Sequence, residues 1–177
     1  MAAAPHSSDP AERYRLSTRW LLFFLGVSIM TVGIAISVHA GLGTSPISSA
    51  PAVLVEVVPL SFGTITVIMN LLFVLIQIAL LRSRFSRLNY LQFLVAFFFG
   101  AMSDLSLRLT SFLQPENYFQ QWVLVVLGAA IVALGVFIQV LPKILYVPGE
   151  GIVAAIAMVT GWKFGTVKQC VDWALVI

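Results

Sequence analysis

Apolar residues are grouped along the chain into long runs that polar positions interrupt only at intervals. Four of these runs approach the roughly 20 residues that a helix needs to cross a bilayer. They cover residues 20–38, 62–81, 88–109 and 122–141. Two shorter apolar segments, 46–60 and 148–160, each begin at a proline, and a last segment begins at Phe164. This pattern predicts an all-α, polytopic membrane protein with five spans, the last segment included, and two short helices.

Composition supports a membrane location and removes several other classes. The chain is 60% hydrophobic and 10% charged, whereas about a quarter of the residues in a soluble domain are charged and disordered chains are poor in apolar residues. The net charge of +3 comes from Lys and Arg that mostly flank apolar segments, so it indicates membrane topology rather than nucleic-acid binding. The single cysteine, Cys170, excludes an internal disulfide, and no metal or cofactor site is predicted from it or from His6 and His39.

The two halves of the chain share residues at a constant spacing of 102 (128 − 26). Matching Gly, Pro, Phe and Thr are poorly explained by apolar composition, so the spacing indicates a duplicated unit of three segments. We divide the chain into a polar tail (1–18) and one membrane domain (19–177), with repeat one at 20–81, a connecting segment at 82–120 and repeat two at 121–177. The matched pairs are Gly26 with Gly128, Gly33 with Gly135, Pro46 with Pro148, Phe62-Gly63-Thr64 with Phe164-Gly165-Thr166, and Asn70 with Asp172.

The short middle segments of the repeats decide the topology. If they span the bilayer, the arginines at 82–87 lie on the side opposite those at 13–19. If they are broken or re-entrant helices, these six arginines share one side with Lys143 and Lys163, and only Arg108 lies across the membrane. The positive-inside tendency favours the second arrangement, with a cytoplasmic N-terminus and two repeats of opposite orientation. Inverted repeats with interrupted short helices are typical of transport proteins. A pair of short, tilted, buried helices without a site is the alternative.

Several motifs resemble those of the YczE/YitT-like bacterial membrane proteins, in particular the YczE branch. The resemblance runs from about residue 20 to the end and implies a multi-pass protein of the bacterial plasma membrane. The family has no assigned activity, so it supplies no catalytic residues. Its members usually continue further, which agrees with a last span cut short at 164–177. The motifs are Gly41-Leu42-Gly43-Thr44-Ser45-Pro46, Phe62-Gly63-Thr64 with Asn70, Pro148-Gly149-Glu150-Gly151, and Phe164-Gly165-Thr166 with Asp172.

Ionisable groups at membrane depth are costly, so each prompts a functional hypothesis. Glu150 lies between Gly149 and Gly151 at a helix start, where it either binds solute or protons or simply caps its own helix. Asp172 follows Lys168 by four residues, so it either couples protons or forms an ion pair on one helix face.

Uncharged polar groups complete the predicted site. Asn70, the repeat mate of Asp172, is predicted to be its polar, non-titrating partner. Thr166 is predicted to support the same solute site. Gly43, Thr44 and Ser45 precede a helix start that either binds an anionic group or forms an ordinary capped turn.

The function that these features favour is a membrane transporter or channel for a small polar or anionic solute, with the site between the two repeats. No enzyme motif occurs, so we predict no catalytic residues. The alternative is a membrane scaffold or regulator that assists another membrane protein without transporting anything. The predicted partners are the lipid bilayer and a small-molecule solute, not nucleic acid; a homo-oligomer is left open.

Overall fold

A computed structural model describes residues 15–176. The polar tail assigned to 1–18 therefore lies largely outside the described residues, as do Arg13 and Ile177. Every regular element among the described residues is helical, and four helical stretches are long and apolar enough to cross a membrane: α1, α3 with η2, η3 with α4, and α5. The predicted all-α, polytopic membrane fold is thus confirmed. The elements are α1 (Leu16–Ala40), α2 (Pro46–Leu54), α3 (Phe62–Leu81), η2 (Arg82–Arg84), η3 (Arg87–Leu91), α4 (Gln92–Leu109), α5 (Tyr118–Val140), α6 (Pro148–Thr160) and α7 (Phe164–Val176).

The two short helices differ in how well their ends were predicted. α6 covers 148–160 as predicted, because Gly161 adopts φ 73° and ends the helix in the left-handed conformation. α2 ends at Leu54, whereas the sequence predicted a helix to residue 60, and the chain continues there as turns. Hydrogen-bonded turns follow α2, and Pro59 stops any helix short of residue 60, because proline lacks a backbone N–H and disfavours helical backbone at the residue before it.

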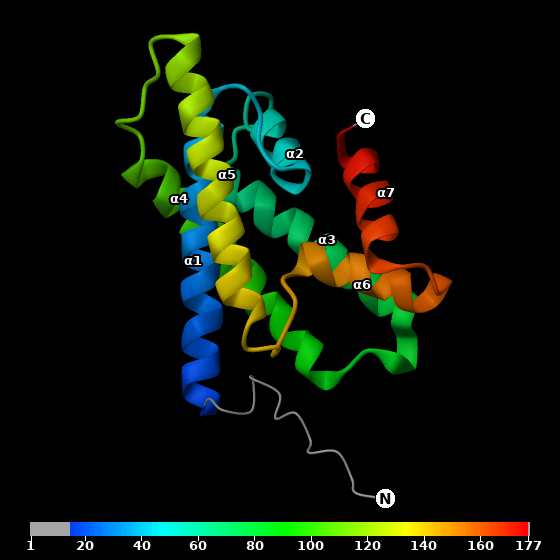
Figure 1. The fold of residues 1–177 in the computed structure, drawn as a ribbon. Helices are drawn as coiled ribbons and strands as arrows, with labels where there is room; N and C mark the ends of the chain where they lie inside the picture. Colours follow the sequence, from blue (N-terminus) through cyan, green and yellow to red (C-terminus); the bar gives the residue numbers. More distant parts are fainter. Residues whose placement is uncertain (1–14, 177) are drawn as a thin grey trace, which may run out of the picture.

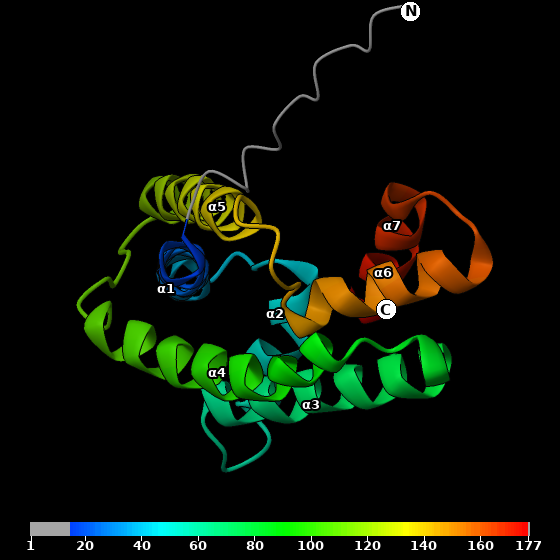
Figure 2. The same cartoon turned by 90° about the horizontal axis from the view of Figure 1, so that it is seen from below.

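Helices α1 and α5 form one tightly packed antiparallel pair (Figures 1 and 2). A methyl group built on Gly26 would lie 2.7 Å from the carbonyl oxygen of Gly135, and one on Gly33 would lie 2.7 Å from that of Gly128. The two backbones therefore touch at two crossing points, each made of one glycine from either helix. Small residues at this spacing permit such close approach in membranes.

Helices α3 and α4 form a second antiparallel pair, which is strongly tilted against the first (Figures 1 and 2). The start of α3 is fixed by Asp104 of α4, whose carboxylate accepts hydrogen bonds from the Gly63 N–H at 2.6 Å and the Ser61 hydroxyl at 2.5 Å. Asp104 and Arg108 stand four residues apart near the end of α4, and this spacing alone predicts an interfacial pair. The carboxylate instead satisfies a backbone donor at a helix start, where such donors lack partners.

Three segments, one helix turn and two connections, gather at one end of the molecule. The first turn of α1, the α3–α4 connection and the α5–α6 connection lie at the lower end of Figure 1, whereas the α1–α2 connection lies at the upper end. Arg19 of α1 donates two hydrogen bonds to the carbonyl oxygen of Pro142, at 3.0 and 2.6 Å, and so joins two of the lower segments. Helix α3 runs back from the upper half toward the lower end. The arginines at 82–87 thus lie at the same end as the first turn of α1.

Candidate functional site

The starts of α2 and α6 meet inside the molecule. Both helices have proline at a first-turn position, which suits the fixed backbone angle of proline. A methyl group built on Gly149 would lie 2.8 Å from the Cδ1 atom of Ile47. Glycine at 149 therefore allows the two helix starts to come into contact.

Three buried glutamines surround the start of α6. Gln77 of α3, Gln92 of α4 and Gln139 of α5 are each 1% exposed, and we call them the amide cluster. The Nε2 atom of Gln77 donates to the Oε1 atom of Gln92 at 3.0 Å and to the carbonyl oxygen of Pro148 at 3.2 Å. A methyl group on Gly151 would lie 2.6 Å from the Gln77 Oε1 atom, so glycine at this position leaves the room that the Gln77 amide occupies.

Glu150 accepts a hydrogen bond from Gln139, one member of the amide cluster. The Nε2 atom of Gln139 donates to the Oε2 atom of Glu150 at 3.0 Å. The Oε1 atom of the same amide is buried and has no hydrogen-bond partner among the described residues. Buried polar atoms in proteins are nearly always paired, so an unpaired acceptor here requires an explanation.

The start of α2 carries hydroxyl groups and no carboxylate. Ser45 occupies the cap position, but its hydroxyl donates to the Ser48 hydroxyl at 3.0 Å instead of accepting from the helix backbone. Ser48 is buried, and the Thr44 Oγ1 atom is buried without a partner in the described part of the chain. Gly43 is exposed at φ 117°, which only glycine adopts readily. The backbone donors of this start are therefore not used by a capping side chain.

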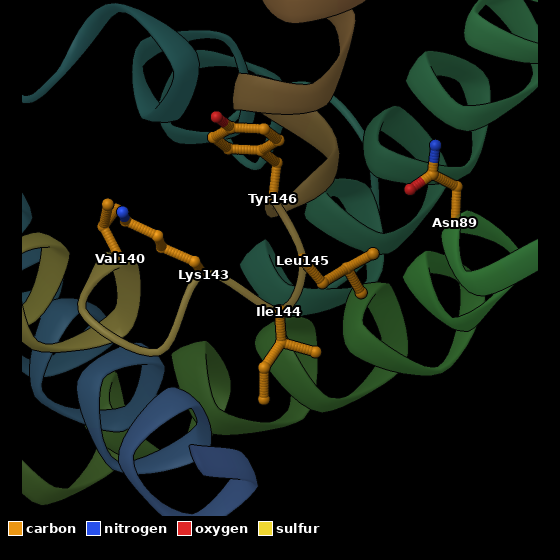
Figure 3. Close-up of a pocket in the computed structure, with 6 residues that line it drawn as sticks. All are labelled: Asn89, Val140, Lys143, Ile144, Leu145 and Tyr146. Atoms are coloured by element: carbon orange, nitrogen blue, oxygen red, sulfur yellow. The ribbon is translucent and has the colours of Figure 1, made fainter. Parts of the chain in front are cut away.

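Each helix start is preceded by an open pocket. The pocket before α2 has a volume of about 490 Å³ and is lined by Leu42, Gly43, Thr44 and Ser45 together with Ser37 of α1 and several α5 residues. The pocket before α6 has a volume of about 330 Å³. Figure 3 shows its lining: Asn89 reaches it from η3, and Val140, Lys143, Ile144, Leu145 and Tyr146 belong to the end of α5 and the connection to α6.

The other residues predicted for the site lie in different surroundings. The Nζ atom of Lys168 lies 2.5 Å from the Oδ1 atom of Asp172, as their spacing predicted. Asp172 also lines an open pocket of about 370 Å³ next to Pro46, which places it at the α2 start. Asn70 is buried in α3, whereas Thr166 is exposed in the first turn of α7.

Sequence reasoning did not identify Gln92, Gln139 and Ser48 as part of this region. The available signal was an uncharged polar side chain near the end of an apolar run, which does not tell whether the group faces lipid or protein. Among the described residues, no group of three or more His, Cys, Asp or Glu side chains is arranged to hold a metal ion.

Four long apolar helices make this an integral membrane protein. Comparison with curated proteins and with solved structures gives no match. The model of a family of unknown function, DUF6198, matches residues 17–177, which is nearly the whole chain. The chain therefore belongs to the DUF6198 family.

Proposed function

We propose that this protein is a transporter or channel for a small polar or anionic solute, whose path runs between two inverted repeats and past the starts of α2 and α6. The resemblance to YczE/YitT-like proteins and the distribution of arginines support a bacterial plasma membrane and a cytoplasmic N-terminus. Opposed short helices at the interface of inverted repeats are where transporters bind their solutes.

The glycine contacts support the inverted repeat. A shift of 102 residues exchanges repeat mates, so it turns the contact between Gly26 and Gly135 into one between Gly128 and Gly33. Both contacts are present. The contact between Ile47 and Gly149 maps onto itself. A two-fold axis between the halves produces this pattern, because every contact across such an axis occurs twice or lies on the axis.

The two pockets carry the proposal. Residues 42, 43 and 44 line the pocket before α2, and their repeat mates 144, 145 and 146 line the pocket before α6. Residues 42–45, which line one pocket, belong to the α1–α2 connection at the upper end of Figure 1, and residues 143–146, which line the other, belong to the α5–α6 connection at the lower end. Two equivalent pockets at opposite ends, with the meeting point of the short helices between them, are the arrangement that a solute path needs.

The chemistry of the helix starts fits a polar or anionic solute. Unpaired backbone N–H groups at a helix start attract negative charge. At α2 no acidic side chain lies in the first turn. Pro46 has no N–H, and the N–H groups of Ser48 and Ser49 donate to the carbonyl oxygen of Ser45, which leaves the N–H of Ile47 for a solute. The hydroxyls of Thr44 and Ser48 add further donors beside it.

Uptake into proteoliposomes tests the proposal. Wild-type protein, Glu150→Gln and Glu56→Gln are compared for uptake of a panel of small anions, amino acids and sugars. Glu56 is an exposed carboxylate on the α2–α3 connection, so its variant is the matched control. We expect uptake by wild type and by Glu56→Gln. Glu150→Gln should take up solute at least about tenfold more slowly, because a hydrogen bond between the solute and the charged carboxylate contributes about 1.5–3 kcal/mol. Absence of uptake by every form contradicts the proposal.

A further inference from the structure

Helix α4 covers one face of α1, whereas no described helix covers the corresponding face of α5 (Figure 2). Phe23, Val27 and Met30 of α1 are buried in one core cluster with residues of α4. The repeat mates of these three residues line the open pocket before α2: Val125, Ala129 and Val132. In the most apolar stretch of each helix, 56% of α1 but only 17% of α5 is buried. The side of α5 that corresponds to the α4 side of α1 is therefore open.

The open face of α5 is long and apolar. On α1, the Thr31 hydroxyl lies 3.1 Å from a serine hydroxyl of α4, and the His39 Nε2 atom lies 3.1 Å from a carbonyl oxygen of α4. Their repeat mates are Ala133 of α5 and Leu141 at its end, both exposed and without hydrogen-bonding side chains. From residue 125 to 141 this face extends about 24 Å at 1.5 Å per residue, which is most of the bilayer core. Its length and chemistry suit a second membrane helix.

The start of α7 is exposed where the start of α3 is covered. A methyl group built on Gly63 would overlap a carbonyl oxygen of α4, whereas nothing lies within 4 Å of one on its repeat mate Gly165. The Ser61 hydroxyl donates to the Asp104 carboxylate, and the repeat mate of Ser61 is the exposed Lys163. An ammonium group also donates and adds a positive charge. A helix that covers α7 in this way is therefore expected to carry a carboxylate opposite Lys163.

We propose that a further membrane-spanning helix binds against α5 and α7 as α4 binds against α1 and α3. It carries a small residue where it crosses Gly165 and, four residues later, an aspartate or glutamate that pairs with Lys163. This inference rests on the inverted repeat of the proposed function, which makes α4 the template. In a second copy of the chain, the described spanning helices carry such a pair only at Gly100 and Asp104, which α3 covers. The occupant is therefore a helix other than those described.

The bound helix completes the pocket before α2. Asn89 of η3, which leads into α4, lines the pocket before α6, and that pocket has a volume of about 330 Å³. The pocket before α2 has no lining residue from α4 or η3, and its volume is about 490 Å³. Residues 144–146 keep their pocket although α4 is present. Their repeat mates, 42–44, are therefore expected to keep a narrower pocket when the further helix is bound.

The test measures binding of a synthetic helix to the purified full-length protein in bicelles. The probe is a peptide with the sequence of α4, residues 92–109, in which Ser106 is replaced by alanine to match Ala133. It carries an acceptor dye, and energy transfer from the tryptophans of the protein reports binding. Trp162 and Trp173 lie next to or on α7, and the peptide contains no tryptophan.

We expect saturable binding to the wild type and none to Gly165→Leu. Lys163→Gln should bind at least about tenfold more weakly, because it loses a hydrogen bond between charged groups. A peptide with Asp104→Asn should lose the same factor on the wild type and nothing further on Lys163→Gln, since both changes remove one pair. Ala79→Leu and Arg84→Gln, at exposed positions of α3 and η2, are the matched controls and should bind like the wild type.

Several results would overturn the inference. One is the absence of saturable binding to the wild type; another is equal binding to the wild type and to Gly165→Leu. Losses at Lys163 and at the peptide carboxylate that simply add would remove the proposed pair. A dimer of the wild type alone that Gly165→Leu abolishes would show that a second copy covers this face instead. Solute uptake without peptide binding removes the further helix and leaves the proposed function, whereas peptide binding without uptake of any solute does the reverse.

Discussion

Replacement of Gly135 by alanine is expected to push α1 and α5 apart. The added methyl carbon would lie 2.5 Å from the backbone nitrogen of Met30, 2.7 Å from its Cα atom and 2.8 Å from the carbonyl oxygen of Gly26. Non-bonded carbon atoms attract best at about 3.5–4.0 Å, so the helices must separate by roughly 1 Å. All three neighbours are backbone atoms, and no side-chain rotation relieves the clash.

The expected cost of Gly135→Ala is about 1–3 kcal/mol in the free energy of unfolding, the usual range for overpacking a well-packed interior. Gly165→Ala is the matched control, because no atom lies within 4 Å of a methyl group at that position. There alanine changes only the helix propensity, which favours it over glycine by at most about 1 kcal/mol.

Equilibrium unfolding in mixed micelles of increasing SDS content, followed by tryptophan fluorescence, measures both variants. The two substitutions Gly26→Ala and Gly135→Ala open the same contact. The double variant should therefore lose less free energy of unfolding than the sum of the losses of the two single variants. A Gly135→Ala protein whose free energy of unfolding equals that of the wild type or of Gly165→Ala would refute the close backbone contact.

Three further substitutions test other contacts. Gln77→Leu leaves the Gln92 oxygen and the first carbonyl of α6 without their donor, so we expect a loss of about 1–3 kcal/mol in SDS unfolding, partly recovered when Gln92 is also replaced by leucine. Asp104→Ala removes the acceptor at the start of α3 and should cost about 0.5–2 kcal/mol, whereas Asp104→Asn, which keeps an acceptor, should cost less in the same assay. Lys168→Met should cost at most about 1 kcal/mol because the pair is partly exposed, and adding Asp172→Asn should restore stability by removing the unpaired charge.

Helix positions were largely predictable from the sequence because the bilayer imposes a simple pattern. Apolar runs of spanning length marked α1, α3, α4 and α5, and Pro148 marked the start of α6 to the residue. The end of α2 was missed because an apolar run was continued through a proline. Local chain geometry, not hydrophobicity, ended that helix.

The candidate site was predictable only in part. The carboxylates Glu150 and Asp172 stood out because charges are rare in apolar segments, and the pairing of Asp172 with Lys168 follows from their spacing on one helix. Gln92 and Gln139 did not stand out, since their partners come from other helices. Tertiary packing decides which face of α4 or α5 contacts α6, and the sequence of a single helix does not predict this.

Thiol labelling at the start of α2 tests most directly whether a polar path runs between the two halves. Ser48→Cys and Leu127→Cys are prepared in a Cys170→Ser background, because Cys170 is exposed. Ser48 is 5% exposed and lies at the meeting point of the short helices, whereas Leu127 is 47% exposed on α5, where it faces lipid in our account. In intact membranes we expect a small charged thiol reagent to modify the cysteine at 48 and to leave the cysteine at 127 unmodified. Complete protection at position 48, with the protein folded, would contradict a solute path and would indicate a packed scaffold.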